Sequence, residues 1–150
     1  MYTRAMAAGF LVIGISAALA AGKPATDLDH FQGPWKVVKL TFNGRSAPAE
    51  VVEKGQYVFK KNKLTIRESE TSHQECEFTL NPDQDPKTID IVGSDGPAKG
   101  KKMLGIYRIK GDTLTLCIGE ERPKEFSDAD KAGLLELERQ KEEKKDKTKE

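Results

Sequence analysis

The sequence predicts an all-β domain that forms one antiparallel, eight-stranded up-and-down barrel, with a sandwich of two sheets as the alternative. Eight short segments alternate apolar and polar residues, which is the pattern of strands with one buried and one wet face. The connections are short and rich in Gly, Asn, Asp and Pro, so consecutive strands are expected to run antiparallel. We favour the barrel because closing the sheet removes its exposed edges.

The segments with the strand pattern follow one another closely along the chain. They span residues 35–43, 56–60, 63–68, 74–80, 88–92, 103–109, 113–118 and 133–139. Asn43-Gly44 is a turn dipeptide, and three glycines and one proline make residues 93–100 a loop. One short helix is predicted at Ala49–Lys54, where Gly55 ends it.

Residues 1–20 are predicted to form a secretory signal peptide. Arg4 supplies a positive start, residues 5–19 carry no charge, and Ala18-Leu19-Ala20 matches a cleavage site. Cleavage near Ala20 would export the protein to the periplasm or the medium and would leave no stable membrane anchor. An uncleaved anchor is the alternative, but the apolar run is short for a span of about 20 residues.

The rest of the chain divides into three parts. We expect a polar lead-in at residues 21–29, the barrel domain at residues 30–139 and a charged tail at residues 140–150. The tail has no apolar residue with which to offset the entropy of ordering, so we expect it to be disordered. A chain of 150 residues therefore fits one folded domain.

Composition argues against several classes of function. The chain has 25 basic and 24 acidic residues, a net charge of +1, whereas nucleic-acid-binding domains show a basic excess. The two histidines, His30 and His73, lie far apart with no Cys or carboxylate at ligand spacing, so we expect no metal site. Because no nucleophile motif or nucleotide-binding loop is present, we predict no catalytic residue, no enzyme activity and no cofactor.

The inward-facing residues are predicted to form either a solid core or the lining of a ligand cavity. An eight-stranded barrel is just wide enough for side chains to fill it or for one small ligand to bind. The candidate ligand-binding residues are Trp35, Val37, Leu64, Ile66, Phe78, Ile89, Ile91, Ile106, Leu114 and Leu116. We favour the filled core, with Trp35 as a plug at one end of the barrel.

Cys76 and Cys117 are the two cysteines, and an oxidising compartment favours a disulfide between them. However, Cys76 alternates in phase with Phe78, which we expect to be buried, whereas Cys117 is out of phase with Leu116. Side chains on opposite faces of a sheet do not meet unless a bulge intervenes. A Cys76–Cys117 disulfide is therefore the less favoured of the two possibilities.

Five short sequence motifs follow one another along the chain. They are Phe31-Gln32-Gly33-Pro34-Trp35-Lys36-Val37-Val38, Ser94-Asp95-Gly96-Pro97-Ala98-Lys99-Gly100-Lys101, Leu104-Gly105-Ile106-Tyr107, Gly111-Asp112-Thr113-Leu114-Thr115-Leu116-Cys117 and Arg122-Pro123-Lys124-Glu125-Phe126. Together they resemble an uncharacterised lipocalin-like domain family that is abundant in planctomycete bacteria. The resemblance covers residues 28–139 and implies a small β-barrel, but it implies no activity because the family has none established. The chain departs from the family in its charged tail and in Cys76.

Three further side chains are candidates for closing an end of the barrel. Phe126 is expected to cap one end, and Arg122 is expected to pair with a carboxylate there. The resemblance implies that an arginine lies over the tryptophan, so Arg122 or Arg139 is expected to stack on Trp35 as a cation–π pair.

Two functions are compatible with these features. The first is an exported binding module that takes a hydrophobic or amphipathic small molecule through one open end of the barrel. The alternative is a structural or protein-interaction domain of the cell envelope, with a filled barrel that docks on an envelope protein. An apolar cavity open to solvent would favour the first, and a packed interior with an exposed apolar patch would favour the second. The sequence predicts no oligomeric state.

Overall fold

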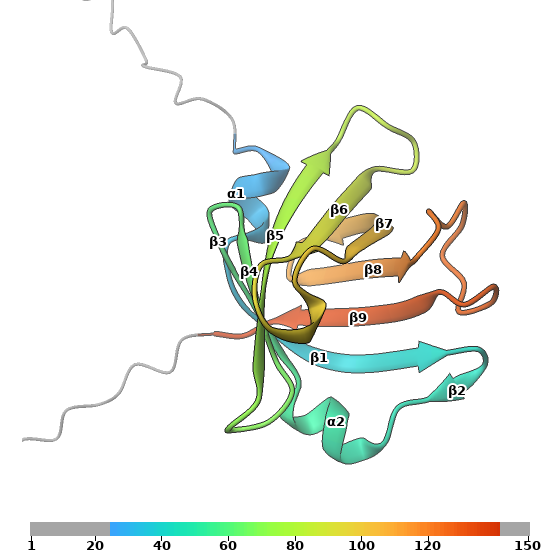
Figure 1. Cartoon of the computed structure of the whole chain (residues 1–150). Helices are drawn as coiled ribbons and strands as arrows, with labels where there is room; N and C mark the ends of the chain where they lie inside the picture. The colour runs from blue at the N-terminus through green and yellow to red at the C-terminus, as the bar shows by residue number, and fades with distance from the viewer. Residues whose placement is uncertain (1–24, 142–150) are drawn as a thin grey trace, which may run out of the picture.

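Nine strands form one continuous antiparallel sheet in the computed structural model, which describes residues 25–141 (Figure 1). Strands β1 and β3 to β9 follow one another in the sheet, and pairing of β1 with β9 closes them into a barrel of eight strands. The predicted barrel is confirmed, and the two-sheet alternative is wrong. The elements in chain order are α1 (Asp27–Phe31), β1 (Gly33–Phe42), β2 (Arg45–Ser46), α2 (Ala49–Lys54), β3 (Gln56–Lys60), β4 (Lys63–Arg67), β5 (His73–Asn81), β6 (Thr88–Gly93), η1 (Gly96–Ala98), β7 (Lys102–Lys110), β8 (Thr113–Gly119) and β9 (Gly133–Arg139).

Strand β2 is a short hairpin arm beside the end of β1, and it is the strand that the sequence analysis does not predict. Thr41 pairs with Ser46, and Phe42 pairs with Arg45. The turn between them is Asn43-Gly44, where φ is 49° and 74°, as a two-residue hairpin turn of type I′ requires. Two residues are too few to show alternation, so the sequence predicts the turn without the strand.

The alternating strand directions sort the turns and loops into two ends of the barrel. Helix α1, the start of β1 and the turns β3–β4, β5–β6 and β7–β8 lie at one end, which we call the α1 end. Helix α2, the end of β1, the η1 loop and the long connection from β8 to β9 lie at the other, the α2 end. Figure 1 shows α1 and α2 on opposite sides of the barrel.

Aromatic rings fill the barrel at the α1 end. The Phe31 ring lies edge-on to Phe59 at 5.1 Å and to Tyr107 at 5.0 Å, measured between ring centroids. Phe78 is stacked on Phe31 at 6.1 Å, and the fully buried Trp35 belongs to the same cluster. Each aromatic pair adds about 0.5–1.5 kcal/mol beyond its buried area, so this half of the barrel is a tightly packed core.

Helix α1 crosses the boundary between the predicted lead-in at residues 21–29 and the barrel domain. Thr26 caps the helix, because its hydroxyl accepts a hydrogen bond from the Asp29 amide while the Asp29 carboxylate accepts one from the Thr26 amide. The helix is thereby fixed where Phe31 enters the core. The Thr26-x-x-Asp29 spacing is the sequence signal for this helix, and the sequence analysis misses it.

A second, smaller apolar cluster lies on the outer face of β7 and β8. Its members are Ile106, Cys117, Ala132, Phe126 and Leu134. The prediction that Ile106 faces the interior is wrong, because its neighbour Tyr107 takes the inward position and strand residues alternate between faces. Phe126 packs on this outer face, where the Arg108 guanidinium lies 4.7 Å from its ring centroid, and it does not cap an end of the barrel.

Candidate functional site

The predicted ligand-binding residues come together mainly as a packed core. Eight of them are buried in one cluster, namely Trp35, Val37, Leu64, Phe78, Ile89, Ile91, Leu114 and Leu116. Ile66 is partly buried against that cluster, and Ile106 belongs to the outer one. Phe31, Phe59 and Tyr107 also fill the interior, although the sequence analysis does not include them. The inward position of Phe59 could have been predicted, because Phe59 lies two residues from Tyr57 in one predicted strand and so shares its face.

Trp35 and Arg139 close the α1 end together. The indole Nε1 of Trp35 donates to the Phe31 carbonyl at 2.8 Å, and the Arg139 guanidinium lies 4.4 Å from the indole ring centroid. Arg139 also donates to the carbonyls of His30, within helix α1, and of Gln32, the residue that caps its C-terminal end. Of the two arginines expected to stack on Trp35, Arg139 is therefore the one that does so, and Trp35 acts as a plug.

Arg122 makes its contacts on the outside of the barrel. Its guanidinium donates to the Gly105 carbonyl at 2.8 Å and to the carboxylate of Asp90. Asp90 alternates with the buried Ile89 and Ile91, so this carboxylate faces outward. The predicted pairing of Arg122 with a carboxylate is confirmed, but the pair anchors the β8–β9 connection to β6 and β7 and leaves the barrel end uncovered.

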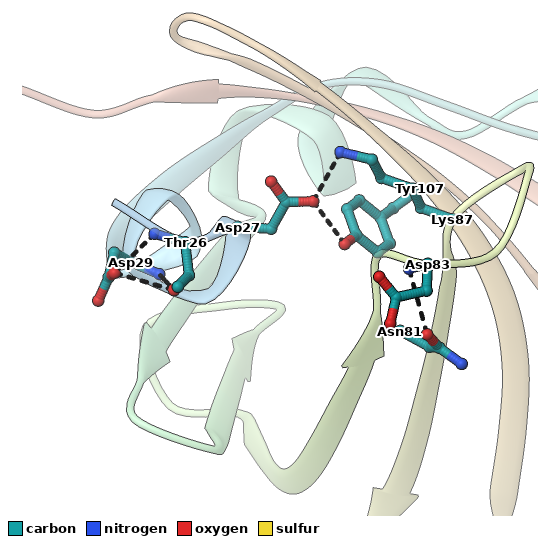
Figure 2. Close-up of polar contacts among 7 residues, drawn as sticks. All are labelled: Thr26, Asp27, Asp29, Asn81, Asp83, Lys87 and Tyr107. Atoms are coloured by element: carbon teal, nitrogen blue, oxygen red, sulfur yellow. Dashed lines mark hydrogen bonds and ion pairs between the residues drawn. The ribbon is translucent and has the colours of Figure 1, made fainter. Parts of the chain in front are cut away.

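A partly buried polar cluster ties helix α1 to the barrel wall (Figure 2). The Asp27 carboxylate, at the first position of α1, accepts a hydrogen bond from the Lys87 ammonium at 2.8 Å and from the Tyr107 hydroxyl at 2.7 Å. Lys87 belongs to the β5–β6 connection, in which the Asp83 amide donates to the Asn81 side-chain oxygen at 3.2 Å. Tyr107 is only 1% exposed, so we assign the cluster a structural role as the latch of α1.

The latch shifts the pKa values of its members in opposite directions. Burial on its own raises the pKa of the Asp27 carboxyl, but the hydrogen bonds from Lys87 and Tyr107 outweigh it and hold that pKa below its ordinary value. Burial and the Asp27 charge raise the pKa of Tyr107. The carboxylate therefore stays ionised and the phenol stays protonated over the physiological range.

Exposed apolar side chains gather at the α2 end. Phe42 at the end of β1 is 49% exposed, Met103 at the start of β7 is 45% exposed, and Val51 in α2 is 39% exposed. We call these three residues the apolar rim. Behind the rim, the partly buried side chains that pack on the core include Leu40, Val52, Ile66 and Ile118.

The rim continues the inner face of the barrel. Phe42 lies two residues from Leu40 on β1, and Met103 lies four residues from Tyr107 on β7, so each shares a face of its strand with a residue that packs in the core. Phe42 pairs with Gly133, where an added Cβ would lie 3.9 Å from the Phe42 ring. Glycine therefore places no side chain against the Phe42 ring, and Phe42 is 49% exposed.

Tyr57 is a partly buried polar residue that packs on the core from strand β3. It pairs with Trp35 and Ile66 on the neighbouring strands, and its hydroxyl makes no hydrogen bond with another residue in the described part of the chain. Burial, followed by the charges of Glu68 and Cys76, raises the pKa of Tyr57 to about 12. The hydroxyl is therefore a neutral donor at neutral pH.

The two cysteines are free and lie on opposite faces of the sheet. Cys76 is buried in the main core, and Cys117 is buried in the outer cluster, where its thiol donates to the Ser127 carbonyl at 3.1 Å. The less favoured Cys76–Cys117 disulfide is absent, as strand parity indicated. Burial raises the pKa of both thiols, which keeps them protonated and unreactive.

A polar groove of about 620 Å³ lies on the outer face of β3, β4 and β5, beside the end of α2. It is lined by Lys54, Gln56, Thr65, Arg67, Ser69, Glu70, His73 and Glu75. Arg67 pairs directly with Gln56 on one side and with His73 on the other, so all three side chains share a row across the sheet. The sequence analysis misses this groove, because alternating polar residues on a strand predict only a solvated face.

Among residues 25–141, no group of three or more His, Cys, Asp or Glu side chains is arranged to hold a metal ion. The described helices are all too short or too polar to cross a membrane. No family model matches the chain, and neither a curated protein nor a solved structure shows significant similarity to it. The resemblance to a lipocalin-like family therefore stays a prediction.

Proposed function

We propose that this protein is an exported interaction domain of the cell envelope, with a filled barrel, that binds an envelope protein through the apolar rim. One contrast carries the proposal: the inner residues of the α1 end are tightly packed, whereas Phe42, Val51 and Met103 are exposed at the other end. A signal peptide, which the sequence predicts in residues outside the described range, would deliver the domain to that compartment.

The three rim residues share the α2 end of the barrel, on β1, α2 and β7. Single exposed apolar side chains are common, but several at one end of a domain favour a binding surface. Phe and Met are also enriched at protein interfaces, where they bury apolar area against the partner. Leu28 and Val38 have similar exposed fractions, 41% and 42%, but lie at the other end and in mid-strand. They therefore serve as matched controls.

A small amphipathic molecule is the second candidate for the same mouth. The observation in its favour is the Tyr57 hydroxyl, which lacks a protein partner among the described residues and lies on the inner face near partly buried apolar side chains. A head group that accepts a hydrogen bond would pair with it, and an apolar chain would cover the rim. The filled interior limits such a ligand to a shallow site.

Site-specific photo-crosslinking in the living host tests the main proposal. A photoreactive phenylalanine analogue at position 42 is expected to give one discrete protein adduct, and the same analogue at position 28 none. Met103→Gln is expected to abolish the adduct formed from position 42, whereas Val38→Thr leaves it unchanged. Equal adducts from both positions, or lipid adducts alone from position 42, would contradict a protein partner at the rim.

A further inference from the structure

The polar groove carries both signs of charge in an ordered arrangement. Its basic side chains, Lys54 and Arg67, lie near Gln56, at the edge formed by β3 and the end of α2. Its acidic side chains are Glu70, in the β4–β5 turn, and Glu75, on β5. Arg67 makes no ion pair or hydrogen bond with another side chain in residues 25–141. The groove thus contains the guanidinium of Arg67, which has no side-chain partner among the described residues.

The C-terminal end of the described chain lies at the edge of this groove. Gln140 follows β9, and its amide donates to the Pro34 carbonyl at 3.0 Å. Its side-chain oxygen accepts a hydrogen bond from the Gln56 side chain at 2.6 Å, and Gln56 lines the groove. Whatever follows Gln140 in the chain therefore starts at the Gln56 side of the groove, and Arg67 is the next residue in the same row.

The charges that follow match those of the groove in order. After Lys141 the sequence continues Glu142-Glu143-Lys144-Lys145. Adjacent strands lie about 4.8 Å apart, so the row from Gln56 to His73 spans roughly 10 Å. From the end of β9 to β5 there are four such spacings, roughly 19 Å. An extended chain covers about 3.3 Å per residue, so residues 141–145 reach about 16 Å and their side chains span the rest. In this direction the two glutamates meet Arg67 first, beside Lys54, which already pairs with Glu50 at 3.0 Å. The two lysines then meet the acidic side of the groove.

We infer that the polar groove is a docking site for the chain's own C-terminal segment, residues 141–150, within the same molecule. This inference is independent of the proposed function. Exposed ion pairs contribute little one at a time, but the covalent connection gives the segment a high effective concentration at the groove. The docked state is accordingly sensitive to salt, because added ions screen exposed charges.

Paramagnetic relaxation enhancement measures this contact in the full chain. The variant Asp146→Cys accepts a spin label, while Cys76 and Cys117 stay unlabelled because they are 4% and 0% exposed. We expect the label to broaden the amide signals of Arg67, His73 and Glu75 strongly. The preference of the broadening for these three amides is expected to disappear in about 1 M NaCl and in the variant Arg67→Glu.

Two further variants define the control. Lys63→Glu reverses a charge on the same strand, but Lys63 does not line the groove, so this variant is expected to keep the broadening. Combining Arg67→Glu with Glu142→Lys and Glu143→Lys is expected to restore the selective broadening that Arg67→Glu alone removes. The inference fails if the label broadens the whole surface around Gln140 evenly, or if Arg67→Glu has no effect. It also fails if the broadening appears only between labelled and unlabelled molecules, because the segment would then dock on a second copy.

Discussion

At the scale of single residues, the α1 end depends on a few polar side chains whose partners are buried. Asp27 joins α1 to Lys87 and Tyr107, and Arg139 joins the carbonyls near α1 to the face of Trp35. Removing Asp27 would leave the hydroxyl of Tyr107, a residue that is 1% exposed, without its acceptor, and removing Arg139 would uncover the ring of the buried Trp35. The cost of removal is therefore larger than the small net value of an ordinary surface contact.

The Asp27 latch gives a stability difference that depends on pH. The pKa of Asp27 in the folded protein lies below its ordinary value of 3.8, so its contribution is fully present above about that pH. The contribution is lost as the pH falls through the lower folded value. Asp27→Asn is expected to lower the free energy of unfolding by about 1–3 kcal/mol at neutral pH and by much less near pH 2.

Urea unfolding at both pH values checks this prediction. Asp83→Asn is the control, because Asp83 is exposed in the β5–β6 connection and only its amide makes a hydrogen bond there. It is expected to change the free energy of unfolding very little at either pH. An equal deficit for Asp27→Asn at both pH values would show that the loss does not come from the ionised carboxylate.

The contact of Arg139 with Trp35 requires the planar guanidinium. Arg139→Lys keeps the positive charge, but an ammonium cannot stack on the indole and donate to two carbonyls together. We expect a loss of about 1 kcal/mol in the free energy of unfolding and a red shift of Trp35 emission in the native state. Arg45→Lys, at an exposed position on β2, is expected to leave both unchanged. Unaltered emission in Arg139→Lys would argue against the stacking.

At the scale of elements, the strands were predictable because alternation lasts for five residues or more in each of them. Helix α2 was predictable because Gly55 ends it, and a side chain there would collide with Val37 and with the Val51 carbonyl. Helix α1 and strand β2 span five and two residues, which is too short for a periodic signal. They are defined by a capping box and a hairpin turn, so only turn and cap chemistry indicates them.

Helix α1 has a structural importance that its length does not suggest. Phe31 is fully buried and contacts three other rings. Phe31→Ala is expected to lower the free energy of unfolding by roughly 3–5 kcal/mol, because it leaves a cavity at the centre of the aromatic cluster. Leu28→Ala, in the same helix but 41% exposed, is the matched control and is expected to cost far less. Chemical denaturation of both variants measures the difference, and similar losses would mean that α1 does not plug the barrel.

At the scale of the whole molecule, closure of the barrel decides which residues meet. Parity along each strand predicts most of the core, but it fails at Ile106, because the β8–β9 connection buries the outer face of β7 as well. The apolar rim combines residues from β1, α2 and β7, and the polar groove combines α2 with three strands. Neither site forms a sequence motif, because the residues of each site come from segments that are far apart in the chain and that only the fold brings to the same end or face of the barrel.

The central claim is that the barrel is filled and binds its partner at the rim. Native mass spectrometry of the mature domain, purified gently from its own host, tests this claim most directly. The account predicts no bound small molecule, so the polypeptide has its own mass with both cysteines reduced, either alone or in a complex with a protein partner. A reproducible additional mass that is lost on organic extraction would contradict it, and would identify the domain as a carrier of a small amphipathic molecule.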